Sequence, residues 1–158
     1  MMNIKLIVVG KSESEHLRSW VEVYVKRLSH YTGFEIVTLP DVKNAKNLSV
    51  GELKEREGEM ILRQIEKADK VVLLDEKGKE FSSMEFSKYL EKQMNASVRT
   101  LAFVVGGAFG FSPKVYEKIG ERIAISRMTF SHQMIRLLVV EQIYRAFTIL
   151  KGEPYHNE

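Results

Sequence analysis

The side chains best suited to chemistry gather in the last quarter of the chain. A polar and aromatic segment, 126–136, contains His132, and the tail places Tyr155 beside His156 directly after Pro154. An aromatic ring stacks on an unpaired base and an imidazole hydrogen-bonds to a base edge, so the tail has residue types that suit an RNA ligand. An ordinary frayed terminus is the alternative, and on physical grounds alone it is the commoner outcome.

A glycine-rich segment is the second candidate for chemistry. Residues 106–110 follow an apolar run and precede Ser112-Pro113, which is typical of a helix start. Glycines allow main-chain amides to approach a ligand where a Cβ atom would obstruct them. The spacing is neither that of a dinucleotide-binding fingerprint nor that of a P-loop. We expect a ligand-binding loop here, with a ligand-free tight turn as the alternative.

Other polar residues have weaker claims to function. Asp75 ends an apolar run and is either catalytic or, more often in such a position, a turn or helix cap. Arg136 and Arg145 either line one side of the last helix or are simply solvated. The four histidines show no metal-ligand spacing with carboxylates, so we expect no metal site.

Composition excludes several classes of protein. The chain of 158 residues has no cysteine, which excludes disulfides, thiolate nucleophiles and Cys-ligated metals. The net charge is +3, and residues 113–151 carry seven basic against three acidic residues. This basic bias suits RNA or another phosphate-rich partner, although ordinary solvated helices are as common an explanation.

We expect a single domain spanning residues 1–158. No apolar run approaches the roughly 20 residues needed to cross a bilayer, so we expect no membrane span. The first residues lack the pattern of a secretory leader, which favours a cytoplasmic protein.

Strand-like and helix-like segments alternate along the chain. The predicted strands are 5–9, 34–39, 71–75, 100–105 and 122–125, with a turn at 76–79, and the predicted helices begin near 12, 49, 82, 113 and 131. This alternation predicts an α/β fold, with a mostly parallel sheet covered by helices on both faces. Ligands in such sheets bind beyond the carboxyl ends of the strands.

Several motifs together resemble a known family. They are IKLIVVGK at the start, VVLLDEKGK, FVVGGAFG, ISRMTFSHQMIR, VEQIYRAF and the terminal GEPYH, in matching order over essentially the whole chain. The sequence resembles the ribosomal RNA large subunit methyltransferase H family. That resemblance implies a SPOUT-class fold with a C-terminal trefoil knot and a homodimer. It also implies S-adenosylmethionine as the cofactor and methylation of N3 of a pseudouridine in 23S rRNA of the assembled ribosome.

The resemblance also implies roles for individual residues. The cofactor-binding group carried over from the family is Leu74, Gly106, Ile125, Ser126, Arg127, Met128, Thr129 and Phe130. The catalytic and RNA-facing group is His156, Tyr155 and Arg145, with His132 and Arg136 as nearby RNA-binding residues. We hypothesise a composite site, in which the tail of one protomer reaches the cofactor of the other.

Two other functions remain open from the sequence. A non-catalytic RNA- or ribosome-binding module would keep the fold and bind RNA without transferring a methyl group. A small oxidoreductase with a nucleotide cofactor is disfavoured because the fingerprint, and the ribose-binding acid at its expected spacing, are missing.

Overall fold

The computed structural model describes residues 1–157, which build one parallel sheet of five strands in the order β2-β1-β4-β3-β5. The strands are β1 (Asn3–Val9), β2 (Gly33–Leu39), β3 (Lys70–Glu80), β4 (Thr100–Val105) and β5 (Arg122–Ala124). The α-helices are α1 (Glu15–Leu28), α2 (Val50–Gln64), α3 (Ser83–Asn95), α4 (Pro113–Lys118) and α5 (Met134–Leu150), with 3₁₀ turns at Ala45–Asn47 and Ile65–Lys67. The predicted α/β class and parallel sheet are confirmed.

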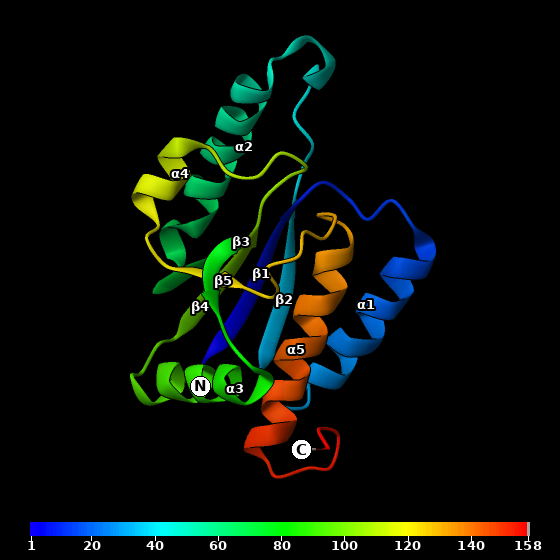
Figure 1. Ribbon diagram of the computed structural model, residues 1–158, viewed down its shortest axis with the longest axis vertical. Helices are drawn as coiled ribbons and strands as arrows, with labels where there is room; N and C mark the ends of the chain where they lie inside the picture. The colour runs from blue at the N-terminus through cyan, green and yellow to red at the C-terminus, as the bar shows by residue number, and fades with distance from the viewer. Residues whose placement is uncertain (158) are drawn as a thin grey trace.

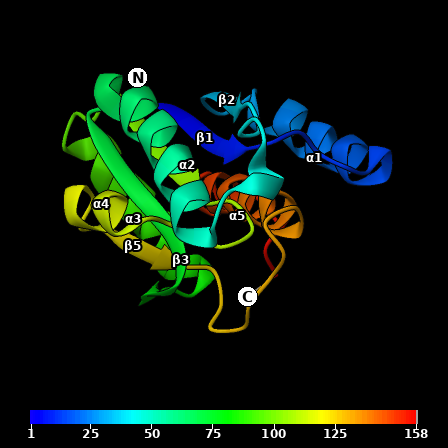
Figure 2. The ribbon, with the colours of Figure 1, turned by 90° about the horizontal axis from the view of Figure 1, so that it is seen from above.

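Both faces of the sheet are buried, and the side chains of successive strand residues pack on opposite faces. On β1, Leu6 and Val8 belong to one apolar cluster, whereas Ile7 and Val9 belong to the other. The first cluster is completed by α1, α3 and α5, and the second by α2 and α4 (Figures 1 and 2). Burial on both faces explains why the strands are continuous apolar runs rather than alternating patterns.

Serine caps begin four of the helices. Ser49 and Ser82 each form a complete capping box with the glutamate three residues later. Ser112 accepts a hydrogen bond from the amide of Val115, with proline at the first helical position. The first helix is capped by Ser14 and ends at Leu28. The predicted helix starts are therefore correct within two or three residues, because caps are local signals.

The turn predicted at 76–79 is wrong, because β3 continues through these residues to Glu80. The pairing between β3 and β5 shifts register between Leu74 and Lys79, so the extra residues form an irregularity within the strand. A Cβ atom on Gly78 would lie 2.7 Å from the main-chain nitrogen of Ile123. Glycine at this position therefore allows β3 to continue close to the main chain of β5. This contact with a distant strand cannot be predicted from the local turn-forming residues.

The last helix connects the two ends of the sheet. It begins beside the carboxyl ends of the strands and ends at the opposite side, where the tail of the chain folds back (Figure 1). Within residues 1–157, no helix is long and apolar enough to span a membrane, and no cluster of side chains has the composition of a metal site.

Candidate functional site

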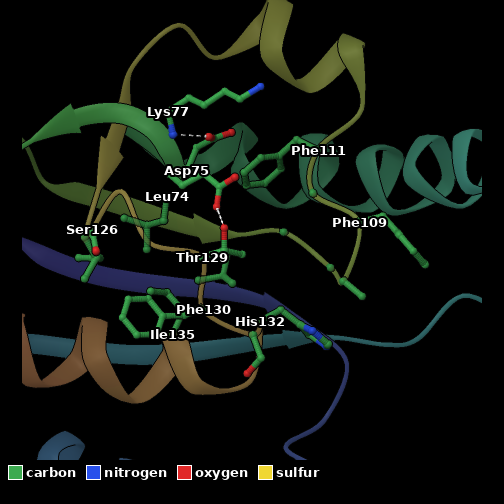
Figure 3. A pocket seen from close by; sticks show the side chains of 18 of the residues that line it. Leu74, Asp75, Lys77, Phe109, Phe111, Ser126, Thr129, Phe130, His132 and Ile135 are labelled. Carbon is green, nitrogen blue, oxygen red and sulfur yellow. Dashed lines mark hydrogen bonds between the residues drawn. The ribbon is translucent and has the colours of Figure 1, made fainter.

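A cavity of about 650 Å³ lies beyond the carboxyl end of β4 and beside residues 74–77 of β3, where the pairing of these two strands ends. Its walls come from the end of β3, the glycine loop after β4 and the segment between β5 and α5 (Figure 3). This is the position at which open parallel sheets bind their ligands, and the volume is within the usual range of small-molecule sites.

Seven of the eight residues expected to bind a cofactor line this one cavity. They are Leu74, Gly106, Ile125, Ser126, Met128, Thr129 and Phe130. The eighth, Arg127, is not among the lining residues, and its guanidinium lies 3.4 Å from the carboxylate of Glu80. The structure thus brings together residues that are more than 50 positions apart in the sequence.

The glycine loop is a tight turn packed against α2. The amide of Gly110 donates to the carbonyl of Gly107 at 3.1 Å, and Gly110 has a φ of +84°. A Cβ atom on Gly107 would lie 2.5 Å from a carboxylate oxygen of Glu57. Glu57 is buried, and burial, followed by the charge of Asp41, raises the pKa of its carboxyl. Sequence reasoning missed Glu57, because nothing local marks a helical glutamate as facing a loop 50 residues away.

Acidic side chains line one wall of the cavity. The Asp75 carboxylate accepts a hydrogen bond from the amide of Lys77 at 2.8 Å and a second from the hydroxyl of Tyr116. The hydroxyl of Thr129 donates to Glu76, which ties the segment after β5 to the end of β3. Tyr116 and Glu76 were also missed by the sequence analysis, whereas Asp75, at the end of the predicted strand 71–75, was expected to be either catalytic or a turn or helix cap.

The start of α5 is fastened to the end of β1 by Arg136. Its guanidinium donates to the carbonyls of Val9 at 2.7 Å, Gly10 at 2.8 Å and His132 at 3.1 Å, and the side chain is only 3% exposed. Burial lowers the pKa of the Arg136 guanidinium. Three of the five N–H donors of Arg136 are thus bound to main-chain carbonyls, so its guanidinium anchors the start of α5, and the RNA contact implied by the family resemblance stays a prediction.

Two residues shortly before Arg136 contact other parts of the site: one lines the cavity, and the other is bonded to the loop after β1. His132 lines the cavity. Gln133 donates to the carbonyl of Lys11 and accepts from the amide of Glu13, both at 3.2 Å. The first turn of α5 is therefore held to the loop after β1 by both side-chain and main-chain groups.

The predicted catalytic residues lie together at the other end of α5. A guanidinium nitrogen of Arg145 lies 3.0 Å from Nδ1 of His156, and the guanidinium lies 4.8 Å from the ring centre of Tyr155. Glu141 pairs with Arg145 at 2.8 Å, which raises the pKa of the guanidinium. Since arginine only donates, Nδ1 of His156 accepts, and a neutral ring then carries its proton on Nε2.

The tail is fixed against helix residues rather than frayed. The ring of Tyr155 meets the ring of Tyr144 edge-on, with 4.8 Å between centres, and its hydroxyl lies 3.2 Å from that of Tyr24. Burial, followed by the hydrogen bond with Tyr24, raises the pKa of Tyr155. Tyr31 also donates to the carboxylate of Glu153 at 2.5 Å.

The cavity and the tail cluster are far apart within one chain. Arg145 is 11 residues after Met134, the first residue of α5, which corresponds to about 16 Å along a helix. Figure 1 shows the tail at the end of α5 that is remote from the glycine loop. One chain therefore does not bring His156 to its own cavity in this conformation.

A second hollow of about 1120 Å³ lies between α1 and the edge strand β2. It is lined by apolar side chains of α1 and β2 and by several charged ones, among them Lys11, Arg18, Glu22, Lys26, Asp41 and Arg136. It contains none of the residues expected to bind a cofactor.

Comparison with known proteins identifies the family. The family model described as "Predicted SPOUT methyltransferase" matches residues 2–156. The chain belongs to the SPOUT methyltransferase family. Its relatives include proteins named ribosomal RNA large subunit methyltransferase H from Parabacteroides distasonis, at 55% identity, and Flavobacterium johnsoniae, at 52%. Each alignment covers 99% of this chain and 100% of the relative, so the resemblance predicted from the motifs is confirmed.

A solved structure has a similar fold. The structure of a probable methylase family protein from Haemophilus influenzae aligns with a TM-score of 0.55 at 13% identity, covering 99% of this chain and 71% of the other. At this identity the likeness concerns the fold alone. The trefoil knot implied by the SPOUT resemblance stays a prediction.

We predict that Arg136→Met destabilises this SPOUT protein strongly. The substitution keeps a long apolar stem but leaves three buried carbonyls without their donor, so the free energy of unfolding should fall by about 3 kcal/mol. Denaturant unfolding measures this change. The matched control is Arg63→Met at an exposed position of α2, which should change it by less than about 0.5 kcal/mol. Equal effects of the two substitutions would contradict the anchoring role.

Proposed function

We propose that this protein is an S-adenosylmethionine-dependent methyltransferase acting on N3 of a pseudouridine in 23S rRNA of the assembled ribosome. The observation that carries the proposal is the gathering of seven expected cofactor residues around one cavity of a SPOUT-family chain. The relatives named ribosomal RNA large subunit methyltransferase H support the class of RNA. The reaction would then take place in the cytoplasm, where ribosomes are found.

The cavity suits S-adenosylmethionine in shape and chemistry. When bound, the cofactor supplies a methyl group already activated by a sulfonium. Leu74, Phe130 and Ile135 offer an apolar wall for adenine, and Gly106 lets the main chain approach closely. A Cβ atom on Gly106 would lie 3.2 Å from the main chain of Gly110, so a larger residue would also disturb the turn.

The active unit that we propose is a homodimer with composite sites. Four large apolar side chains are exposed around the cavity and at the start of α5: Phe109, Met128, Phe130 and Met134. Such a cluster is typical of a surface that another chain covers. In a two-fold dimer with antiparallel α5 helices, the tail end of one helix would meet the cavity end of the other. This arrangement brings Tyr155 and His156 to the partner's cofactor.

Within this site, the tail residues would bind and orient the target base. Tyr155 would stack on it, and Arg145 would stabilise the negative charge that develops on the imide. Because Arg145 occupies Nδ1 of His156, the contact favours a donor role for Nε2 over removal of the imide proton. His132, which lines the cavity, would contact the RNA beside the cofactor.

The first test is transfer of labelled methyl from S-adenosylmethionine to ribosomes that lack the modification, followed by nucleoside analysis. We expect label in N3-methylpseudouridine with assembled ribosomes, and little with free large subunits or naked 23S rRNA. His156→Ala should lower the rate at least about 100-fold, whereas His30→Ala, an exposed histidine, should leave it unchanged. Cofactor binding without methylation of any of these RNAs would support a non-catalytic RNA-binding module instead.

The second test addresses the composite site with mixed dimers isolated through two different tags. One protomer carries His156→Ala and the other Gly106→Val, so a composite arrangement restores one site of two and about half of the wild-type activity. A dimer of a wild-type protomer and one carrying both substitutions should be inactive. If the two results are reversed, each chain uses its own tail and the composite arrangement is wrong.

A further inference from the structure

Asp75 lines the proposed cofactor cavity but is not among the residues expected to bind the cofactor. Its carboxylate is held at both oxygens, by the amide of Lys77 on Oδ1 and by the hydroxyl of Tyr116 on Oδ2. A carboxylate oxygen accepts two hydrogen bonds, and each oxygen receives one from the part of the chain that the structure describes. The group is therefore fixed in direction and still able to accept hydrogen bonds.

Tyr116 is itself held in place. Its ring lies under the guanidinium of Arg122, at 4.2 Å from the ring centre, and meets the ring of Phe111 edge-on at 5.7 Å. Burial, followed by the hydrogen bond and the charge of Asp75, raises the pKa of Tyr116 to about 12. The hydroxyl is therefore protonated at neutral pH and donates to Asp75.

The ligand group that suits this wall is a hydrogen-bond donor. An ionised carboxylate only accepts, and the hydrogen bond from Tyr116, which also lines the cavity, fixes the orientation of the Asp75 carboxylate. In Figure 3, Asp75 lies on the side of the cavity near Lys77 and Phe111, across from Ile135 and Phe130. Glu76, the next acidic residue, already accepts from Thr129.

S-adenosylmethionine offers three such donors: the amino group of adenine, the ribose hydroxyls and the ammonium of its amino-acid part. Asp75 directly follows Leu74, the last residue of β3 that pairs with β4. In the dinucleotide sites of parallel α/β sheets, an acidic side chain accepts hydrogen bonds from ribose hydroxyls, which shows that a carboxylate suits this ligand group. We propose that Asp75 binds the ribose hydroxyls of the cofactor and that Tyr116 is the positioning residue for its carboxylate. This inference rests on the proposed cofactor.

Calorimetric binding of S-adenosylhomocysteine and 5′-methylthioadenosine tests the assignment. Both ligands keep the ribose hydroxyls, but the second lacks the ammonium. Asp75→Asn should raise the Kd of both at least about tenfold, because a hydrogen bond to a charged group is lost. Tyr116→Phe should raise both Kd values about threefold. The control Glu66→Gln, at an exposed position beyond the other end of β3, removes one negative charge and should change neither.

An analogue without the ribose hydroxyls distinguishes a direct contact between these hydroxyls and Asp75 from an indirect structural effect of the substitutions. The wild type should bind 2′,3′-dideoxy S-adenosylhomocysteine at least tenfold more weakly than S-adenosylhomocysteine. The Asp75→Asn and Tyr116→Phe variants should bind this analogue with the same Kd as the wild type. That wild-type measurement needs no variant to fold.

Three results would overturn the assignment. Equal wild-type affinity for the dideoxy analogue would exclude ribose binding by this wall. A penalty of Asp75→Asn that appears with S-adenosylhomocysteine and not with 5′-methylthioadenosine would assign the carboxylate to the ammonium. An unchanged Kd in Asp75→Asn would exclude both roles. Wild-type protein that binds neither ligand would instead contradict the proposed cofactor, and with it the premise of the assignment.

Discussion

The guanidinium of Arg136 is the interaction on which the architecture of the site depends. It joins the last carbonyls of β1 to the first turn of α5 and is almost completely buried. A buried cation without partners would be strongly unfavourable, so the three carbonyls and the arginine require one another. Because α5 is fixed at this point, the segment between β5 and α5 must pass over the ends of β3 and β4, where it closes the cavity.

The anchoring of α5 by Arg136 also keeps the cavity apart from the tail residues that are proposed to bind the target base. An α5 anchored at the carboxyl edge of the sheet has its other end about 24 Å away, given its 17 residues. Arg145 and the tail are consequently directed away from the chain's own cavity. A second protomer is the simplest means of joining them, and the exposed apolar side chains near the start of α5 are where it would pack. Asp75 and Tyr116 line the cavity, so the role proposed for them does not require a second protomer.

The sequence predicted features that are encoded locally. Strand 100–105 coincides with β4 because an apolar run between polar flanks is a sufficient signal, and the serine caps located helix starts for the same reason. The continuation of β3 through Gly78 was missed because it depends on pairing with β5, more than 40 residues later. The burial of Arg136 was missed because two of its carbonyl partners, Val9 and Gly10, lie at the end of β1, more than 120 residues earlier. Most site residues were placed by family resemblance, since periodicity does not indicate which loops meet.

The position of the cofactor is the central claim, and hydrogen–deuterium exchange with and without S-adenosylmethionine tests it most directly. We predict slower exchange of main-chain amides in residues 105–111 and 125–132, two of the three segments that line the cavity, and no change in residues 33–41 of the edge strand and the loop after it. Protection of residues 33–41 and of α1 without protection of the glycine loop would contradict the account, because it would place the cofactor in the hollow between α1 and β2.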